Sequence, residues 1–496
     1  MKKITLFLLL FATSTCLWAQ KLQRPRLVVG IVVDQMRWDY LYYYYDKYKE
    51  DGLKRLLNEG FSCENTMINY VPTVTAIGHS SVYTGSVPAF TGIAGNSFLL
   101  DGKNVTSVTD TTVTAVGSDK QSRDGKCSPR NLLANTIGDQ LKVATDFQAK
   151  VVGVALKDRA SILPAGHAAD AAYWWDGQAG HFISSSYYMN QLPKWVENFN
   201  RLHHTEPGFD IKTSNKGVTM TFQMAEEVLI KERMGKDDVT DLLAVSISST
   251  DAIGHATSTR GKENYEVYMQ LDKDIAKFMH ALDREVGKGN YLLFLTADHG
   301  AIHNGNFMNA HKLPGGGFSG RVASEAVNKQ LSKTFGVEGK YIKWIADCRV
   351  YLDHDFILAQ GLDECKVRKE AVRCLRQDPQ FAYVVDYEDI ANASVPAFLR
   401  ERIINGYHRM RSGDLCLILQ GSHMYGSVGP DYKGTSHGTW NPDDSHIPLL
   451  FMGWHVTKGS TSTPTFMTDI APTVCAMLHI QMPDCCIGNA IQEVWK

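Results

Sequence analysis

The chain has 496 residues, with 51 lysines and arginines against 53 aspartates and glutamates, and a formal net charge of −2. Charged residues make up 21% of the sequence, which indicates neither a nucleic-acid-binding surface nor a polybasic membrane surface. Any affinity for an anion must therefore come from a local site. The length suits two or three average domains, although large α/β enzymes often exceed that size as one domain with insertions.

The first 20 residues have the pattern of a secretory signal peptide. Two lysines precede an apolar run over 4–11, and small and polar residues lead to a cleavage site near Ala19. The run is too short to span a membrane. Cys16 raises the alternative of a lipoprotein, but residues 13–15 are a poor lipidation signal. We therefore expect an exported protein, periplasmic or secreted, without a membrane span.

Cysteine usage agrees with a structural role for this residue type. Removal of the signal peptide leaves nine of the ten cysteines. Export permits disulfides, and Cys485 or Cys486 is a candidate to pair with a distant partner. No C-x-x-C pair suggests a thiolate zinc site.

Five short apolar runs predict the strands of one sheet, at 27–33, 150–155, 242–248, 291–296 and 447–452. Their apolar, often β-branched residues are typical of strands that are buried on both faces. Helical patterns lie between them, most clearly over 262–286. This alternation favours an α/β fold with a mostly parallel central sheet and helices on both faces. Ligands in such folds bind beyond the carboxyl ends of the strands.

Two segments fit the alternation poorly and are predicted to be insertions on the site face. Residues 97–131 are polar and rich in Thr, Ser and Asp. Residues 301–413 begin with a glycine-rich stretch at 312–320 and then mix helical and strand patterns. We expect the second insertion to form a cap or small subdomain within one catalytic domain over 21–496.

Aspartates and histidines stand beside the predicted strands at four places: Asp34, Asp251 with His255, Asp298 with His299, and His437. A set of Asp and His side chains without thiolates is typical of catalytic zinc. Each position alone has an ordinary explanation, because Asp after a strand often caps a helix. The four together predict two metal ions at one edge of the sheet.

A candidate nucleophile lies in residues 69–80, which predict a loop that enters a helix. Thr75 stands at the expected helix N-terminus, where free backbone N–H groups and the helix dipole favour an anion. A threonine hydroxyl needs a metal ion to act as an alkoxide. A simple N-cap is the alternative for Thr75, and Thr73 is an equal candidate on the local pattern.

In their order along the chain, these motifs resemble the alkaline phosphatase superfamily. The matching motifs are Asp34, PTVTAIGH around Thr75, GNSF around Asn96, LKDR with Lys157 and Arg159, DAIGH from Asp251 to His255, ADHG around Asp298 and His299, and SHG around His437. More narrowly, the chain looks like the secreted, monomeric bacterial phosphate-irrepressible alkaline phosphatases that use a threonine nucleophile. The resemblance covers nearly the whole mature chain.

The resemblance implies the roles of the site residues. One zinc ion would be held by Asp251, His255 and His437, and a second by Asp34, Asp298, His299 and the Thr75 oxygen. Asn96, Lys157 and Arg159 would hold the non-bridging phosphoryl oxygens. Thr75 would attack phosphorus to give a phosphothreonine, which water would then hydrolyse to release inorganic phosphate.

Lys157 and Arg159 favour small-molecule phosphomonoesters over phosphodiesters or nucleotide pyrophosphates. A monoester dianion has more charge for cationic groups to stabilise than a diester monoanion. A sulfatase would need a C-x-P-x-R type motif, and the arginine in the Cys-Ser-Pro-Arg sequence at 127–130 comes one residue early. A relative that binds phosphate without catalysis is a further alternative.

Overall fold

The computed structural model describes residues 22–426 and 428–496, so the predicted signal peptide lies outside the described residues. Its centre is a ten-stranded sheet with the order β20-β2-β19-β11-β1-β10-β7-β8-β9-β6. In that order the strands are Gly459–Thr461, Phe61–Cys63, Leu449–Gly453, Tyr291–Thr296, Leu27–Val33, Asp241–Ile247, Val151–Ala155, Ala171–Asp176, His181–Ser185 and Ala115–Val116.

The middle of this sheet is parallel. Strands β11, β1, β10, β7 and β8 pair in parallel, while β19 and β9 add antiparallel neighbours on either side. Every residue of β1 is buried, as its continuous apolar run predicts. The prediction of a mostly parallel central sheet is confirmed.

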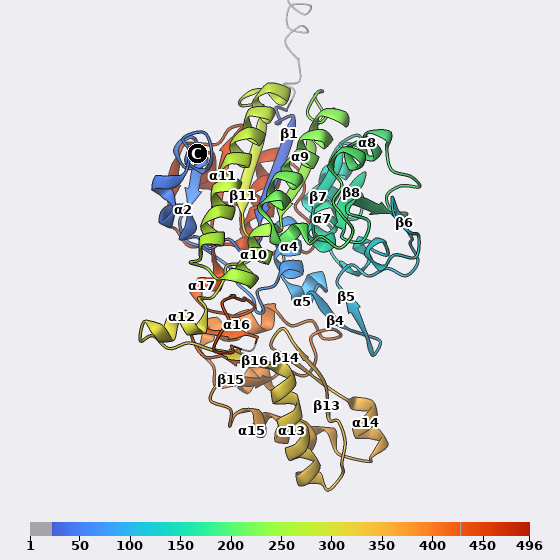
Figure 1. Ribbon diagram of the computed structural model, residues 1–496, viewed down its shortest axis with the longest axis vertical. Coiled ribbons are helices and arrows are strands. Elements are labelled where there is room, and N and C mark those ends of the chain that lie inside the picture. Colours follow the sequence, from blue (N-terminus) through green and yellow to red (C-terminus); the bar gives the residue numbers. More distant parts are fainter. Residues whose placement is uncertain (1–21, 427) are drawn as a thin grey trace, which may run out of the picture.

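Helices cover both faces of the sheet (Figure 1). On one face α9 and α11 pack against each other, and on the other face α4, α6, α7 and α18 pack together. Their bounds are α9 Asn215–Lys231, α11 Lys262–Leu282, α4 Thr75–Thr84, α6 Ile137–Ala144, α7 Asp158–Ala165 and α18 Ile470–Leu478. The predicted helices on both faces are therefore present.

The strands predicted at 150–155 and 242–248 differ by one residue at one or both ends in the structure, and two other predicted elements differ more. The run at 447–452 is divided at Pro448, where β18 (His446–Ile447) ends and β19 begins. Proline cannot donate a ladder hydrogen bond, so it interrupts the strand. The predicted helix at 262–286 ends as an α-helix at Leu282 and continues as one π-helical turn, Asp283–Gly287.

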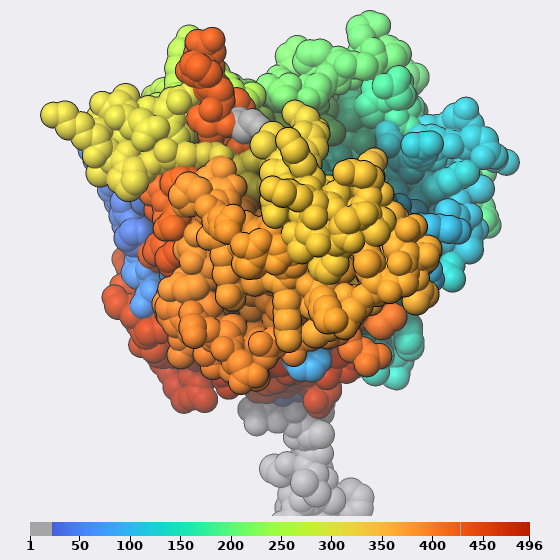
Figure 2. Space-filling model, turned by 90° about the horizontal axis from the view of Figure 1, so that it is seen from below, coloured from blue at the N-terminus to red at the C-terminus, as the bar shows by residue number. Residues whose placement is uncertain are grey.

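A second, four-stranded antiparallel sheet has the order β13-β14-β16-β15. Its strands are Ile342–Ala346, Arg349–Leu352, Leu415–Leu419 and Phe381–Asp386, and α13 (Gly320–Phe335) and α15 (Glu364–Leu375) pack on it around a separate apolar core. The strand β16 lies beyond residue 413. This smaller sheet lies below the main sheet in Figure 1, on the side of α4, and its yellow and orange residues form most of the face in Figure 2.

The polar segment at 97–131 forms a hairpin of β4 (Ser97–Leu100) and β5 (Lys103–Thr106), and then β6, which pairs with β9 at the edge of the main sheet. No helix in the described part of the chain is long and apolar enough to cross a membrane.

Candidate metal centre

Three buried carboxylates meet where neighbouring parallel strands end. Asp34 directly follows β1, Asp298 follows β11, and Asp251 lies in the first turn of α10 (Ser249–Thr257), which follows β10. Because β11, β1 and β10 are adjacent and parallel, their carboxyl ends share one edge of the sheet. The three carboxylates are fully or almost fully buried there.

The first ligand group consists of Asp251, His255 and His437, whose donor atoms lie within 4.8 Å of one another. Asp251 and His255 are one helical turn apart on α10, which puts both on one face of the helix. The Nε2 atoms of His255 and His437 lie 3.0 and 3.6 Å from Asp251 Oδ1.

Backbone carbonyls orient the two imidazoles of the first ligand group. His255 Nδ1 lies 2.9 Å from the Thr435 carbonyl oxygen, and His437 Nδ1 lies 2.7 Å from that of Thr73. A carbonyl only accepts, so each Nδ1 donates and each Nε2 faces the ligand group. Burial also lowers the pKa of His437 well below its usual value, which keeps the ring neutral.

The second ligand group consists of Asp34, Asp298 and His299, again with donor atoms within 4.8 Å. His299 Nε2 lies 3.6 Å from Asp34 Oδ1 and 3.4 Å from Asp298 Oδ2. These two carboxylate oxygens are buried and have no hydrogen-bond partner. Buried carboxylate oxygens are costly unless a donor or a cation satisfies them, so this group fits a divalent cation.

The two ligand groups adjoin each other. The rings of His299 and His437 stack with their centroids 3.6 Å apart. Lys157 Nζ lies 2.6 Å from Asp34 Oδ2 and 2.6 Å from Asp251 Oδ2, so one lysine contacts a carboxylate of each group. The structure therefore brings all six predicted Asp and His ligands together as two neighbouring sites.

The two ligand groups together carry more negative than positive charge. Burial, together with the neighbouring carboxylates of Asp251 and Asp298, raises the pKa of Asp34 to about 8. Burial alone would also raise the pKa of Asp251, but Lys157 and His255 outweigh it and hold that pKa well below its usual range. One lysine among three buried carboxylates leaves negative charge that divalent cations would neutralise.

Thr75 is the first residue of α4 and lies beside the second ligand group. Its Oγ1 is 3.5 Å from His299 Nε2, and only 1% of the residue is exposed. The N-cap position belongs to Val74, and no side-chain cap is present. Thr75 is therefore not the N-cap that the alternative interpretation requires.

The hydroxyl of Thr73 is occupied elsewhere. It lies 2.8 Å from Asp444 Oδ2 and 2.9 Å from the carbonyl oxygen of Thr439, and it accepts from the N–H of Gly438. Between the two threonines that the sequence left as equals, the geometry favours Thr75.

Three further predicted residues surround the same edge. Asn96 Oδ1 accepts from the N–H of Ala76 at 2.9 Å, which leaves the Asn96 amide hydrogens available beside the start of α4. Lys157 is the N-cap residue of α7, and Arg159 lies in its first turn. The Arg159 side chain is 25% exposed, contacts Asp158 at 3.5 Å, and has a buried Nε without a partner.

The site opens on one side. The His255 side chain is 39% exposed, whereas those of Asp34, Asp298 and His299 are fully buried. A ligand would therefore approach from the side of the first ligand group.

Two residues with no predicted ligand role contact these ligands. Gln35 follows Asp34 and hydrogen-bonds both Asp251 and Asp298. His79, one turn after Thr75 on α4, lies 2.9 Å from the Thr75 carbonyl oxygen and 3.3 Å from Asp298 Oδ2. The contacts with Asp251 and Asp298 have no local signal in the sequence, because these partners are distant in the chain.

Other polar features belong to separate places. His354 contacts Glu364 through Nδ1 and Asp414 through Nε2, each at 3.1 Å, near the smaller sheet. The hydrogen bond with Asp414 raises the pKa of His354 to about 9. Because the two ring nitrogens point in opposite directions, we assign this cluster as an ion-pair network rather than a metal site.

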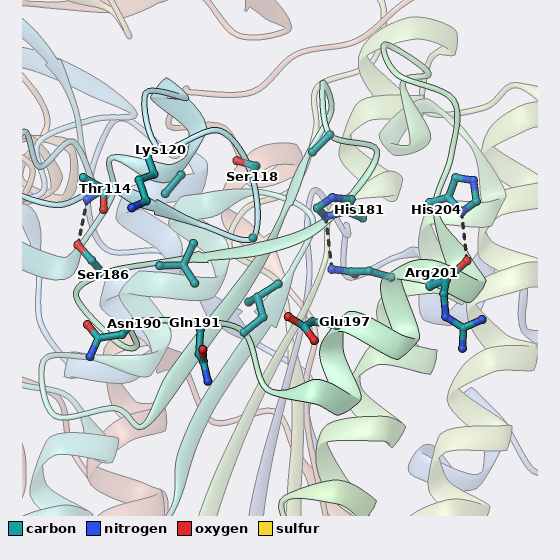
Figure 3. A pocket seen from close by; sticks show the side chains of 16 residues that line it. Thr114, Ser118, Lys120, His181, Ser186, Asn190, Gln191, Glu197, Arg201 and His204 are labelled. Atoms are coloured by element: carbon teal, nitrogen blue, oxygen red, sulfur yellow. Dashed lines mark hydrogen bonds between the residues drawn. The ribbon is translucent and has the colours of Figure 1, made fainter.

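A pocket of about 760 Å³ lies between the β6–β9 edge and α8 (Lys194–His203), as Figure 3 shows. Its lining includes Lys120, Glu197 and Arg201, and within the described chain it includes no predicted site residue. It is distinct from the metal centre.

Comparisons with known proteins agree with this geometry. The family described as "Type I phosphodiesterase / nucleotide pyrophosphatase" matches residues 28–440. A Myroides odoratus protein named "Calcium-transporting ATPase" is 46% identical, and alkaline phosphatase PafA of Elizabethkingia meningoseptica is 43% identical, each over 97% of both chains. The crystal structure of PafA matches 96% of this chain and 100% of that one, with a TM-score of 0.92.

The family match spans most of the sequence, and the PafA match extends along almost the whole of both chains. Both include the strand ends that carry the two ligand groups. The chain therefore belongs to the type I phosphodiesterase / nucleotide pyrophosphatase family, within the alkaline phosphatase superfamily.

Proposed function

We propose that this chain is a metal-dependent phosphomonoesterase, an alkaline phosphatase that releases inorganic phosphate through a phosphothreonine at Thr75. The observation that carries the proposal is the Thr75 hydroxyl, which lies beside two adjoining Asp/His groups at a helix N-terminus. The similarity to PafA, itself an alkaline phosphatase, supports the same activity.

Two zinc ions are the proposed cofactors. Asp251, His255 and His437 would hold one ion, and Asp34, Asp298, His299 and the Thr75 oxygen would hold the other. When bound, such ions supply charge that stabilises the attacking and leaving oxygens of an in-line displacement. The carbonyl-oriented imidazoles and the unpartnered carboxylate oxygens of Asp34 and Asp298 support this assignment.

The protein side chains would do the remaining work. Thr75 would attack phosphorus and displace the substrate alcohol; water that enters from the open side near His255 would later cleave the phosphothreonine, releasing phosphate and restoring the Thr75 hydroxyl. Asn96, Lys157 and Arg159 hold the non-bridging oxygens, where charge is concentrated in a loose transition state. The N–H groups at the start of α4 favour the same anion.

A phosphodiesterase is the second candidate, because the matching family is described by that activity. Lys157 argues for the monoester, since it brings an added positive charge within 2.6 Å of both ligand groups. Turnover of an aryl phosphate, a bis-aryl phosphate, an aryl sulfate and ATP should be compared in parallel. We expect the aryl phosphate to have a higher kcat/KM than the bis-aryl phosphate; the reverse order would establish a diesterase.

The role of Thr75 is tested with Thr75→Ala and the matched variant Thr75→Ser. Loss of a nucleophile typically lowers kcat by roughly 10⁴ to 10⁶. We expect Thr75→Ala to show this loss and no acid-stable phosphoenzyme, whereas Thr75→Ser keeps both. Phosphate binding by the wild-type chain without any turnover would instead identify a non-catalytic relative.

We also infer an exported monomer that acts on small phosphomonoesters and has no nucleic-acid partner. The signal-like N-terminus and the near-neutral charge support this. N-terminal sequencing of the protein recovered from the periplasm or medium should begin near residue 20, and light scattering should give the mass of one chain. An intact first residue in the cytoplasm would contradict export.

A further inference from the structure

Gln35 has an unusual backbone conformation beside the metal centre. Its φ is 65°, in the left-handed region, and only 3% of the residue is exposed. A residue with a Cβ is strained in this conformation. Such strain persists where surrounding contacts impose it, often at a functional site.

The contacts of Gln35 reach both ligand groups. Its backbone N–H donates to Asp298 Oδ1 at 3.1 Å, and its side-chain Nε2 donates to Asp251 Oδ1 at 2.6 Å. Asp298 belongs to the second ligand group and Asp251 to the first. Lys157 holds the other oxygen of Asp251, so both oxygens of that carboxylate are fixed.

A glycine in α10 gives an independent observation. Gly254 lies inside the helix that carries Asp251 and His255, where glycine costs about 1 kcal/mol relative to alanine. A Cβ at Gly254 would overlap Gln35 Oε1, and the nearest atom of any other residue, Thr435 Cγ2, would be 3.6 Å away. The absence of a side chain at this position therefore leaves room for the Gln35 amide.

We propose that Gln35 is a positioning residue that links the two ligand groups and holds the carboxylates of Asp251 and Asp298 in place for metal binding. The left-handed backbone directs the N–H to one carboxylate and the side chain to the other. Gly254 provides the space for this arrangement. The inference rests on the proposed two-metal function, and it assigns Gln35 no contact with substrate.

The test uses Gln35→Ala, Gln35→Gly, Gly254→Ala and the double variant Gln35→Ala/Gly254→Ala in the full mature chain. The first readout is the number of zinc ions that each chain retains against a graded series of chelator concentrations. Loss of a hydrogen-bonding partner of a metal ligand typically lowers metal affinity by about 10 to 100-fold. We expect a loss of this size in both Gln35 variants, with kcat falling more than KM rises.

The Gln35→Gly variant separates the amide from the backbone strain, because glycine adopts positive φ freely. Equal metal loss in the Gly and Ala variants assigns the effect to the missing amide. Metal retention at the wild-type level in either variant overturns the proposal. If Gln35→Ala does not fold, metal retention can still be compared between the wild type and Gln35→Gly, in which the backbone is not strained.

The double variant gives the sharpest outcome. Gly254→Ala alone should lose metal because the new methyl displaces the Gln35 amide. In the Gln35→Ala background the overlap is gone, so the same change should cause no further loss. Additive losses overturn the proposal. A wild-type chain that binds fewer than two metal ions, or hydrolyses no phosphomonoester, would instead refute the proposed function on which it rests.

Discussion

At the scale of single residues, the main feature of the site is the balance of charge among its buried carboxylates. Asp34, Asp251 and Asp298 are buried together, and Lys157 is the cation that contacts two of them at 2.6 Å. The lysine both limits repulsion among the carboxylates and places positive charge where a phosphoryl dianion would bind. Its removal should therefore affect monoesters more than diesters.

The variant Lys157→Met tests this selectivity. We expect kcat/KM for an aryl phosphate to fall by roughly 10² to 10³, as for the loss of one transition-state donor, and that for a bis-aryl phosphate to fall less. Lys142→Met is the matched control, because Lys142 is also buried but pairs with Asp170 at 2.7 Å, outside the ligand groups. Equal losses for the two substrates would contradict a role in monoester selectivity.

Asp444 should affect the pH dependence of stability. Burial raises its pKa from 3.8 to about 8, so the folded chain holds a proton that the unfolded chain has lost between these values. This group therefore contributes stability that is present below pH 3.8 and is lost as the pH rises through 8.

The variant Asp444→Asn lacks this proton but keeps an acceptor for Thr73 and Thr439. The free energy of unfolding of Asp444→Asn minus that of the wild type should therefore increase from roughly pH 5 to pH 9, because the wild type loses stability over this range. Denaturant unfolding of both metal-free chains gives this difference. A difference that stays constant with pH would show that Asp444 is ionised throughout.

At the scale of elements, helix α4 is placed by close backbone contact with the strand end that carries Asp298. A Cβ at Gly78 would overlap the Asp298 carbonyl oxygen and would lie 2.6 Å from the Asp298 Cβ. Thr75 begins the same helix, so the approach at Gly78 fixes the distance between the proposed nucleophile and the second ligand group.

The variant Gly78→Ala should destabilise the protein, although a change from glycine to alanine inside a helix usually stabilises it. Alanine in a helix interior normally stabilises by about 1 kcal/mol relative to glycine. Here we expect a lower free energy of unfolding and a fall in kcat of at least about tenfold. A displacement of the nucleophile by about 1 Å can lower the rate by about 10²-fold. Gly177→Ala, with open space around the position, is the control. Unchanged kcat in Gly78→Ala would show that α4 can shift without harm.

At the scale of the whole molecule, the metal centre joins segments from the two ends of the chain. Its candidate ligands run from Asp34 to His437, and the smaller sheet lies on the same side of the main sheet as the site (Figure 1). Bound metal should therefore stabilise the global fold as well as supply the chemistry.

Metal removal tests this coupling. We expect chelation to abolish phosphatase activity and lower Tm, and zinc to restore both. Each ion that binds only the folded chain stabilises it by about 2.7 kcal/mol at a free concentration 100 times its Kd. Calorimetry of the stripped and zinc-loaded chains measures the shift. The same Tm with and without zinc would argue against a site built from these buried carboxylates.

Much of this organisation was open to prediction from the sequence. The buried strands β1 and β11 were predicted with the bounds they have in the structure, because continuous β-branched and apolar runs have few alternatives. The alternation of such runs with helical patterns determined the α/β class. Asp and His residues at strand ends predicted metal ligands, since the carboxyl ends of parallel strands share one edge.

The contacts across that edge depended on tertiary structure. The choice between Thr73 and Thr75 required the hydroxyl partners Thr439 and Asp444, which lie more than 360 residues along the chain. The left-handed conformation of Gln35 has no local sequence signal, because a glutamine ordinarily avoids it. Sequence patterns determine what each segment prefers by itself, whereas the closeness of distant segments follows from how the strands are ordered and packed.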